Sequence, residues 1–163
     1  MEKIEIIKSK IFDKEELERK LAFWRFKNRK IVFTNGCFDV LHRGHVEYLA
    51  QARDKGDVLV VGLNTDASVR RLKGTGRPVN PQEARAMTLA ALFFVDAVLF
   101  FDEDTPYELI KTVQPDVLVK GADYKPETIV GYDVVTAKGG SVETVDLVAG
   151  FSTTKIIEDL KNE

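Results

Sequence analysis

The chain has 163 residues, 44% hydrophobic and 31% charged, and so fits one globular domain with a sizeable core. Its net charge of −2 excludes a general nucleic-acid coat, which needs a broad basic surface. It has one cysteine, no secretion signal and no apolar run near the roughly 18–20 residues that span a bilayer, so we expect a cytoplasmic protein with no membrane or nucleic-acid partner.

A helix is predicted at 13–26, ahead of the first buried strand. Asp13 is its expected N-cap, with Glu16 at the capping-box position three residues later. Apolar side chains recur at helical spacing, which predicts that one face of this helix is buried. The residues expected on that face are Leu17, Leu21, Trp24 and Phe26.

After this helix, apolar β-branched runs alternate with helical patterns. The predicted strands are 30–34, 57–63, 97–101, 116–119 and 141–145. The predicted helices are 44–55 with Gly56 as C-cap, 65–72, 81–93, one opened by Thr105 with Pro106 at its first position, and 153–160. This alternation indicates an α/β protein whose parallel sheet is covered on both faces. Ligands bind such sheets at the carboxyl ends of the strands, so the segment after residue 34 is the expected site.

Two histidines follow the first strand, where an Asn35-Gly36 turn leads into a helix. His42 and His45 are three residues apart, so both imidazoles can share one face at the helix N-terminus, where free backbone N–H groups favour anions. Gly44 between them leaves room for a phosphate to approach the backbone. Imidazoles donate hydrogen bonds whether neutral or charged, which suits chemistry on a nucleotide's phosphate.

Two other interpretations of the histidines stay open. They could be ordinary polar residues at a helix start. They could also bind zinc together with Cys37, although no fourth ligand lies at a suitable spacing. Cys37 otherwise fits a buried filler, because the sequence offers it no partner base except these histidines.

A basic segment follows the second strand. Its side chains are Arg70, Arg71, Lys73 and Arg77, with Arg85 on the next helix. Lys73 and Arg77 border a glycine-containing loop that could wrap a triphosphate, and Arg85 could face the same site. The alternative is solvated surface charge, which we assign to Arg70 and Arg71.

Two polar segments follow later strands. Residues 152–154, Ser-Thr-Thr, open the final helix, where hydroxyls and free N–H groups form a second anion site, or where one hydroxyl caps the helix. Segment 120–124 follows the fourth strand with a glycine that admits a ligand, an aspartate that can accept from sugar hydroxyls and a tyrosine that can stack. That segment fits an exposed tight turn equally well.

Three common motifs are absent from the sequence. There is no Gly-x-x-x-x-Gly-Lys-Ser/Thr loop, and no Gly-x-Gly-x-x-Gly follows the first strand, which argues against a P-loop kinase and a dinucleotide oxidoreductase. The absence of a Gly-x-Ser-x-Gly elbow argues against an esterase.

Together these segments resemble the cytidylyltransferase-like nucleotidyltransferase superfamily over about 30–160. Residues 34–39 with the His-x-Gly-His at 42–45 resemble its first motif, and 152–154 its last. The chain is similar, more closely, to the adenylyltransferase domain of bifunctional heptose-7-phosphate kinase/heptose-1-phosphate adenylyltransferase proteins, without their sugar-kinase domain. The blocks that carry this similarity are 64–69, 72–74, 77–81, 103–106 and 119–126.

The resemblance implies a Rossmann-like, doubly wound parallel sheet of about five strands in a three-layer α/β/α sandwich. It implies one nucleotidyltransferase domain over 1–163, with 1–29 as a helical extension packed on it. The implied reaction joins ATP, bound with Mg²⁺, to D-glycero-D-manno-heptose 1-phosphate, giving ADP-heptose for lipopolysaccharide biosynthesis and pyrophosphate. Homodimers are common in the superfamily. A cytidylyltransferase for glycerol 3-phosphate or another small phosphate, and a non-catalytic nucleotide-binding module, remain as alternatives.

The resemblance also implies roles for individual residues. Catalytic roles fall to His42, His45, Lys73 and Arg85. Nucleotide contacts fall to Thr34, Asn35, Gly36, Phe38, Gly44, Lys120, Gly121, Asp123, Tyr124, Ser152, Thr153 and Thr154. The acceptor side would be bordered by Asp39, Asp66 and Arg77, and no protein metal site is implied. Ala122, where a second glycine is expected, and Phe151, where a smaller residue is common, depart from the pattern.

Overall fold

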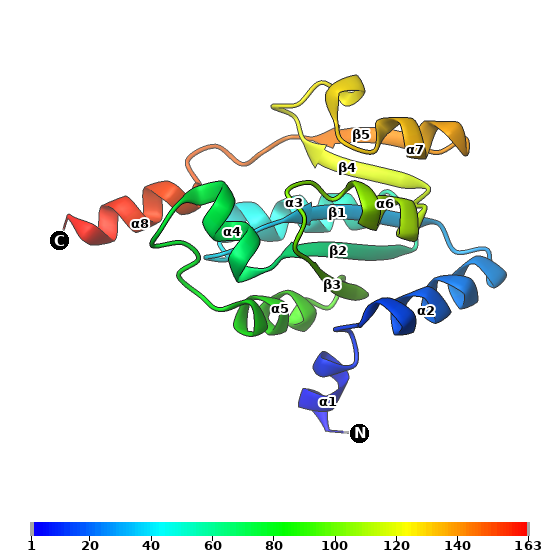
Figure 1. Cartoon of the computed structure of the whole chain (residues 1–163), viewed down its shortest axis with the longest axis horizontal. Coiled ribbons are helices and arrows are strands. Elements are labelled where there is room, and N and C mark those ends of the chain that lie inside the picture. The colour runs from blue at the N-terminus through cyan, green and yellow to red at the C-terminus, as the bar shows by residue number, and fades with distance from the viewer. Residues whose placement is uncertain (1, 163) are drawn as a thin grey trace.

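The computed structural model describes residues 2–162 and contains a five-stranded parallel sheet at its centre (Figure 1). The strands are β1 (Ile31–Gly36), β2 (Val58–Asn64), β3 (Ala97–Phe101), β4 (Val117–Gly121) and β5 (Ser141–Val145). Each predicted strand is present, which confirms the α/β, Rossmann-like class. β1 and β4 each run two residues further than predicted.

The order of the strands is β3-β2-β1-β4-β5, with all pairs parallel. The chain therefore builds outward from β1 through β2 to β3 and then crosses back to place β4 on the other side of β1. This reversal is the topological switch point, and it opens a crevice beyond the carboxyl ends of β1 and β4.

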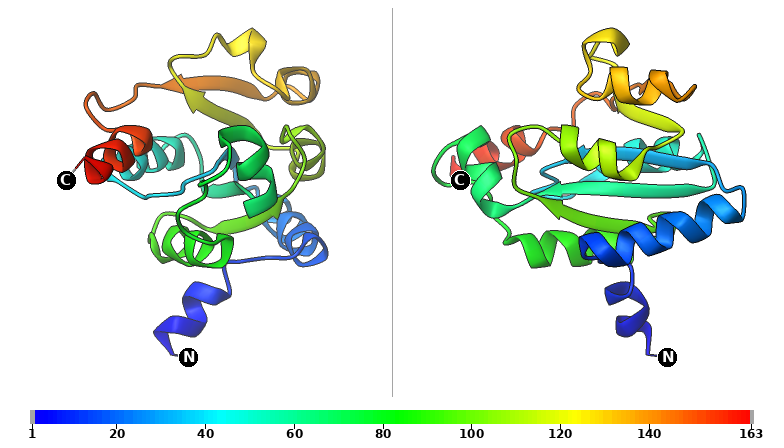
Figure 2. Two further views of the ribbon diagram at one scale, coloured as in Figure 1. Left: turned by 60° about the vertical axis from the view of Figure 1, so that its left-hand side comes forward. Right: turned by 45° about the vertical axis from the view of Figure 1, so that its right-hand side comes forward.

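Helices cover both faces of the sheet (Figure 2). They are α1 (Lys3–Lys8), α2 (Lys14–Phe26), α3 (Arg43–Arg53), α4 (Asp66–Lys73), α5 (Gln82–Ala91), α6 (Tyr107–Val113), the 3₁₀ turn η1 (Pro126–Thr128), α7 (Tyr132–Ala137) and α8 (Thr153–Lys161). Phe33 of β1 joins a core beneath α2, α6 and α7, whereas Val32 joins the core beneath α3 and α5. Neighbouring strand residues point to opposite faces, so one apolar run supplies both cores.

The N-terminal segment packs along the β3 edge of the sheet. The backbone of Val98 donates to the Lys10 carbonyl at 2.8 Å and accepts from the Phe12 N–H at 2.9 Å, so this segment covers a strand edge that would otherwise be open. The predicted capping box of Asp13 and Glu16 is present at the start of α2.

Several local predictions were wrong. Phe26 is 80% exposed, because α2 ends there and its buried stripe stops at Trp24. The C-cap of α3 is Asp54 rather than Gly56; a Cβ on Gly56 would lie 2.7 Å from the Lys30 carbonyl oxygen, so this glycine is needed where two backbones meet. Pro106 is the N-cap of α6, one residue outside the helix.

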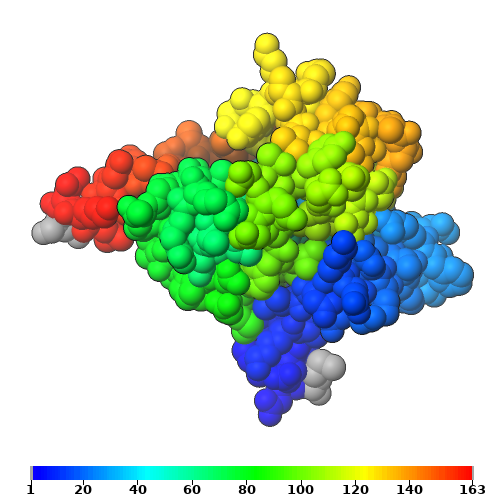
Figure 3. Space-filling model, viewed as in Figure 1, coloured from blue at the N-terminus to red at the C-terminus, as the bar shows by residue number. Residues whose placement is uncertain are grey.

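Three elements were not predicted at all. α1, η1 and α7 have only six, three and six residues, too few to show a clear apolar period. Figure 3 shows α1 and α8 projecting from the body of the molecule. Within residues 2–162 no helix is long and apolar enough to cross a membrane; α2 has 13 residues.

Candidate functional site

A cavity of about 700 Å³ lies beyond the carboxyl ends of the strands, at the switch point. Its wall is formed by the last residues of β1 to β4, the first residues of α3 and α8, and the loop before α8. Most residues predicted for the site lie here. They are Asn35, Gly36, Phe38, Asp39, His42, Gly44, His45, Lys73, Arg77, Lys120, Gly121, Asp123, Tyr124, Ser152, Thr153 and Thr154.

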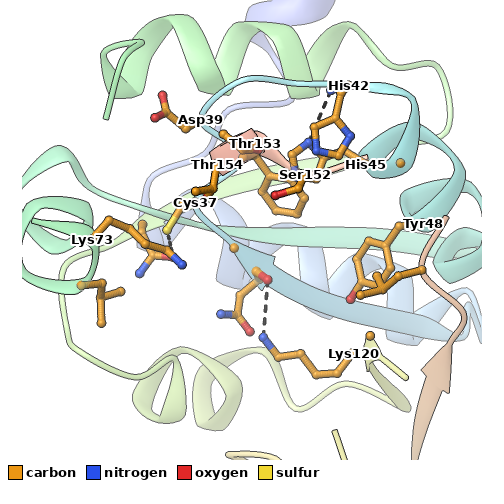
Figure 4. A pocket seen from close by; sticks show the side chains of 18 of the residues that line it. Cys37, Asp39, His42, His45, Tyr48, Lys73, Lys120, Ser152, Thr153 and Thr154 are labelled. Atoms are coloured by element: carbon orange, nitrogen blue, oxygen red, sulfur yellow. Dashed lines mark hydrogen bonds between the residues drawn. The ribbon is translucent and has the colours of Figure 1, made fainter. Parts of the chain in front are cut away.

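The two histidines meet at the start of α3, as their spacing predicts (Figure 4). Their rings are stacked, with centroids 3.8 Å apart and planes 20° from parallel. The backbone N–H of His42, the N-cap residue, donates to Nδ1 of His45 at 3.4 Å. The ring of Phe38 packs edge-on against the ring of His45, with centroids 5.3 Å apart, and supports it from the side of β1.

Both imidazoles are neutral near pH 7. Burial, and then the charge of His42, lower the pKa of His45 to about 4, and burial lowers the pKa of His42. Because Nδ1 of His45 accepts a hydrogen bond, its proton resides on Nε2. The buried Nδ1 of His42 has no partner in the described part of the chain. Buried polar atoms are normally hydrogen-bonded, so this atom indicates a place for a ligand.

Gly44 lines the cavity and also makes room for neighbouring side chains, and the approach of a phosphate to it stays a prediction. A Cβ on Gly44 would lie 3.0 Å from ring atoms of His42 and 3.1 Å from Cβ of Phe151. The ring of Phe151 stacks over the ring of His42 with centroids 6.1 Å apart. The guanidinium of Arg43 lies 5.7 Å from the centroid of the Phe151 ring. Phe151, which departs from the family pattern, therefore packs the loop before α8 against the start of α3.

The N-terminus of α8 points its first residues into the same cavity. Ser152 is the N-cap, and its hydroxyl accepts from the Lys155 N–H at 3.4 Å. Thr153 and Thr154 follow as the first helical residues and line the cavity with Ser152. Two helix N-termini and three hydroxyls thus face one space, an arrangement that suits a chain of phosphates.

The end of β4 forms the floor of the cavity. Nζ of Lys120 donates to the Asn35 carbonyl at 3.5 Å, and burial lowers the pKa of Lys120 to about 8. A Cβ on Gly121 would lie 2.7 Å from Oδ1 of Asp123, so the glycine lets this carboxylate turn inward. Tyr124 is 53% exposed at the rim.

Arg85 does not line the cavity, contrary to its predicted phosphate contact. Its side chain is fully buried and donates to the carbonyl oxygens of Cys37 at 2.7 Å, Asn64 at 2.9 Å and Asn80 at 3.0 Å. It also pairs with Asp66 at 2.7 Å, which removes that carboxylate from the acceptor side. Arg85 holds the ends of β1 and β2 in place from beneath the site.

Asp39 and Arg77 line the cavity but bind one another at 2.7 Å. The Asp39 carboxylate also accepts from the backbone N–H groups of Val79 and Asn80 at 2.8 and 2.9 Å. Burial alone would raise the pKa of Asp39, but these bonds outweigh it and lower the pKa. The oxygens of Asp39 thus fasten the loop at 77–80, and its role at the acceptor stays a prediction.

Thr34 lies beneath the floor, fully buried, with its hydroxyl 2.7 Å from the hydroxyl of Tyr48. The cavity also has lining residues that were not predicted for the site: Cys37, Tyr48, Asn64, Leu72, Phe101, Asp104, Pro106, Leu147, Val148 and Phe151. Asn64 and Phe101 end β2 and β3, so the carboxyl-end rule could have found them. Leu147 and Val148 carry no local signal of a site.

The zinc alternative finds no support in the part of the chain that the structure describes. Among residues 2–162, no three histidine, cysteine, aspartate or glutamate side chains gather closely enough to hold a metal ion. Cys37 instead lies 3.9 Å from Oδ1 of Asn64, and burial raises the pKa of its thiol.

The fold is that of a doubly wound α/β protein, with its cavity at the switch point where such proteins bind ligands. A family model described as cytidylyltransferase-like matches residues 33–159, and the chain belongs to this family. The resemblance seen in the motifs is thereby confirmed.

Curated relatives support the same assignment. The chain is 57% identical over 154 residues to the bifunctional protein HldE of Campylobacter jejuni, covering 94% of this chain and 32% of that one. It is 59% identical over 150 residues to the HldE of Syntrophotalea carbinolica, covering 92% of this chain and 31% of that one. The chain thus spans about a third of the length of these relatives.

Solved structures show the same fold. A lipopolysaccharide core biosynthesis protein from Thermoplasma volcanium superimposes with a TM-score of 0.60 at 29% identity, over 74% of this chain and 97% of that one. A pantoate-β-alanine ligase from Francisella tularensis gives a TM-score of 0.63 at 16% identity, over 93% of this chain and 76% of that one, and is alike in fold alone.

Proposed function

We propose that the chain transfers AMP from ATP to D-glycero-D-manno-heptose 1-phosphate, producing ADP-heptose and pyrophosphate. The observation that carries this proposal is the single cavity in which a stacked, neutral histidine pair faces the hydroxyl-bearing N-terminus of α8. The identity to HldE proteins and the likeness to a lipopolysaccharide core biosynthesis protein support the sugar branch.

The reaction needs positioning and charge stabilisation more than covalent help. An oxygen of the sugar 1-phosphate forms a bond to the α-phosphorus of ATP, and the bond from that phosphorus to the bridging oxygen breaks as pyrophosphate leaves. His42 and His45 would donate to the α-phosphate, where charge develops. The hydroxyls and backbone N–H groups at 152–154 would hold the β- and γ-phosphates. Lys73 would approach the attacking phosphate and the α-phosphate from α4.

Mg²⁺ bound with ATP would supply further neutralisation of the phosphates. This ion takes only one or two carboxylates beside substrate phosphates and water. Asp39, Asp104 and Asp123 are the carboxylates that line the cavity. Asp39 is occupied by Arg77 and the neighbouring backbone, and Asp104 pairs with Arg71 at 3.1 Å, so Asp123 is the residue that fits such an ion. We place the reaction in the cytoplasm, where ATP is supplied.

The direct test is pyrophosphate release from ATP, Mg²⁺ and the heptose 1-phosphate. His45→Ala is expected to lower turnover by about 100-fold or more, the usual effect of losing one donor to developing charge. Glu47→Ala, an exposed change on the same helix, serves as the control. Absence of release at high enzyme concentration would reject the proposal.

Two further outcomes identify the alternatives. Faster turnover with CTP and glycerol 3-phosphate would make the chain a cytidylyltransferase. Nucleotide binding without transfer across a panel of phosphorylated acceptors would make it a binding module.

A further inference from the structure

The ammonium group of Lys120 lines the cavity and has fewer hydrogen-bond partners than it has donors. Its Nζ carries three donors, yet its one hydrogen bond to the described chain is the 3.5 Å contact with the Asn35 carbonyl. Beside it, the buried Oδ1 of Asn35 has no partner within residues 2–162. Buried polar groups are rarely left unsatisfied, so a bound molecule is expected to complete this part of the floor.

The charges around Lys120 favour an anion. Burial lowers the pKa of Lys120, whereas Cys37 at the end of β1 and Asp123 after β4 raise it. Lys73, from the end of α4, acts on the same Cys37 thiol. Lys73 and Lys120 both line the cavity, so two ammonium groups face one space. Like charges in a partly buried site repel, and an anion between them relieves that repulsion.

Lys120 lies apart from the histidine pair that would hold the α-phosphate. Figure 4 shows the histidines on one side of the cavity and Lys120 on the other, with Lys73 on a further side next to Cys37. The proposed reaction brings together two phosphate groups that repel each other. It therefore needs a second set of cations for the group that attacks.

We infer that Lys120, together with Lys73, binds the phosphate of the acceptor sugar and is a catalytic residue for the second substrate. The inference rests on the proposed function, and it moves Lys120 from the nucleotide, where the family resemblance placed it, to the acceptor. The ammonium stays protonated throughout; it neutralises the attacking phosphate while the oxygen–phosphorus bond forms and pyrophosphate departs.

The test compares Lys120→Met with Lys120→Arg and with Lys125→Met, a matched change at an exposed lysine of the next turn. Lys120→Met is expected to raise the KM for the sugar 1-phosphate at least tenfold and to leave the Kd for ATP, measured by calorimetry, within twofold. Lys120→Arg recovers part of the loss, and Lys125→Met changes neither constant. Melting temperatures report folding, and Lys120→Gln replaces the methionine variant if that variant does not fold.

The pH dependence gives an independent readout. Because the ammonium loses its proton near pH 8, the KM for the acceptor should rise between pH 7 and 9 in the wild type and stay flat in Lys120→Met. The titratable groups beside Lys120, Cys37 and Asp123, remain in both proteins, so the difference between the two profiles belongs to Lys120.

The outcomes separate this inference from the proposed function. A weakened Kd for ATP in Lys120→Met, or an acceptor KM within threefold of wild type, would overturn the inference while the transferase activity stands. If the wild type transfers AMP to no phosphorylated acceptor, the proposed function fails, and the inference is tested with inorganic phosphate alone. Tighter phosphate binding to the wild type than to Lys120→Met would then support the anion site, and equal binding would overturn it.

Discussion

Replacing Arg85 with methionine should destabilise the fold more than any other single change at the site. The buried guanidinium joins the carbonyls of Cys37, Asn64 and Asn80 to the carboxylate of Asp66. Methionine fills similar apolar volume but donates no hydrogen bond. The substitution therefore leaves these oxygens without donors beneath the cavity.

The magnitude follows from burial. Each carbonyl left unsatisfied costs about 1–3 kcal/mol, although such terms do not add fully. Removing one partner of a buried ion pair costs about 3–5 kcal/mol. The Asp66 side chain keeps 23% of its exposure and can recover water, so we expect a loss of about 4 kcal/mol in the free energy of unfolding. For a chain of this size, that loss lowers the melting temperature by about 8–16 °C.

Urea unfolding and thermal melting of Arg85→Met measure this loss directly. Arg70→Met, a change at an exposed arginine of α4, is the control and should stay within about 0.5 kcal/mol of wild type. An Arg85→Met protein that melts within 2 °C of wild type would refute the view that this arginine holds the ends of β1 and β2 together.

Two further predictions concern the histidine pair. The pKa of His45 is lowered from 6.5 to about 4 by burial and by His42, so the unfolded chain takes up a proton at higher pH than the folded one. Stability should therefore fall as the pH drops from about 6.5 toward 4, and urea midpoints of His45→Gln should fall less over that interval; parallel profiles would contradict the assignment. Gly44→Ala places a methyl 3.0 Å from the His42 ring and 3.1 Å from Cβ of Phe151, while gaining up to about 1 kcal/mol of helix propensity. Calorimetry should show weaker ATP binding with a melting temperature no more than 3 °C lower, and unchanged affinity would show that the ring tolerates displacement.

The sequence identified the main features of the site because their signals are local. The run that forms β1, the turn after it and the His-x-Gly-His spacing all lie within 15 residues, 31–45. Helix starts with Ser, Thr or His at the cap are likewise visible without a fold. These local signals were enough to predict a phosphate-binding crevice with His42 and His45 at its centre.

The roles of the charged residues could not be predicted from the sequence. From sequence, Asp39, Asp66, Arg77 and Arg85 are equivalent candidates for contact with a substrate. In the fold, Arg77 lies 38 positions from Asp39, and Arg85 lies 48 positions from the Cys37 carbonyl that it binds. Only these long-range contacts show that the four residues form two ion pairs, Asp39 with Arg77 and Asp66 with Arg85, which hold the loops and strand ends around the site.

The five strands, the longer helices, the helix starts suited to anions and the family can be predicted from the sequence alone. Folding determines which charged side chains bind other groups of the protein and which keep donors or acceptors for a ligand. The physical reason is that periodicity and caps depend on neighbours along the chain, whereas burial and ion pairing depend on residues brought together by folding. Arg85 and Lys120 are both basic and lie near the carboxyl ends of the strands, but Arg85 donates to four protein oxygens, whereas Lys120 donates to one.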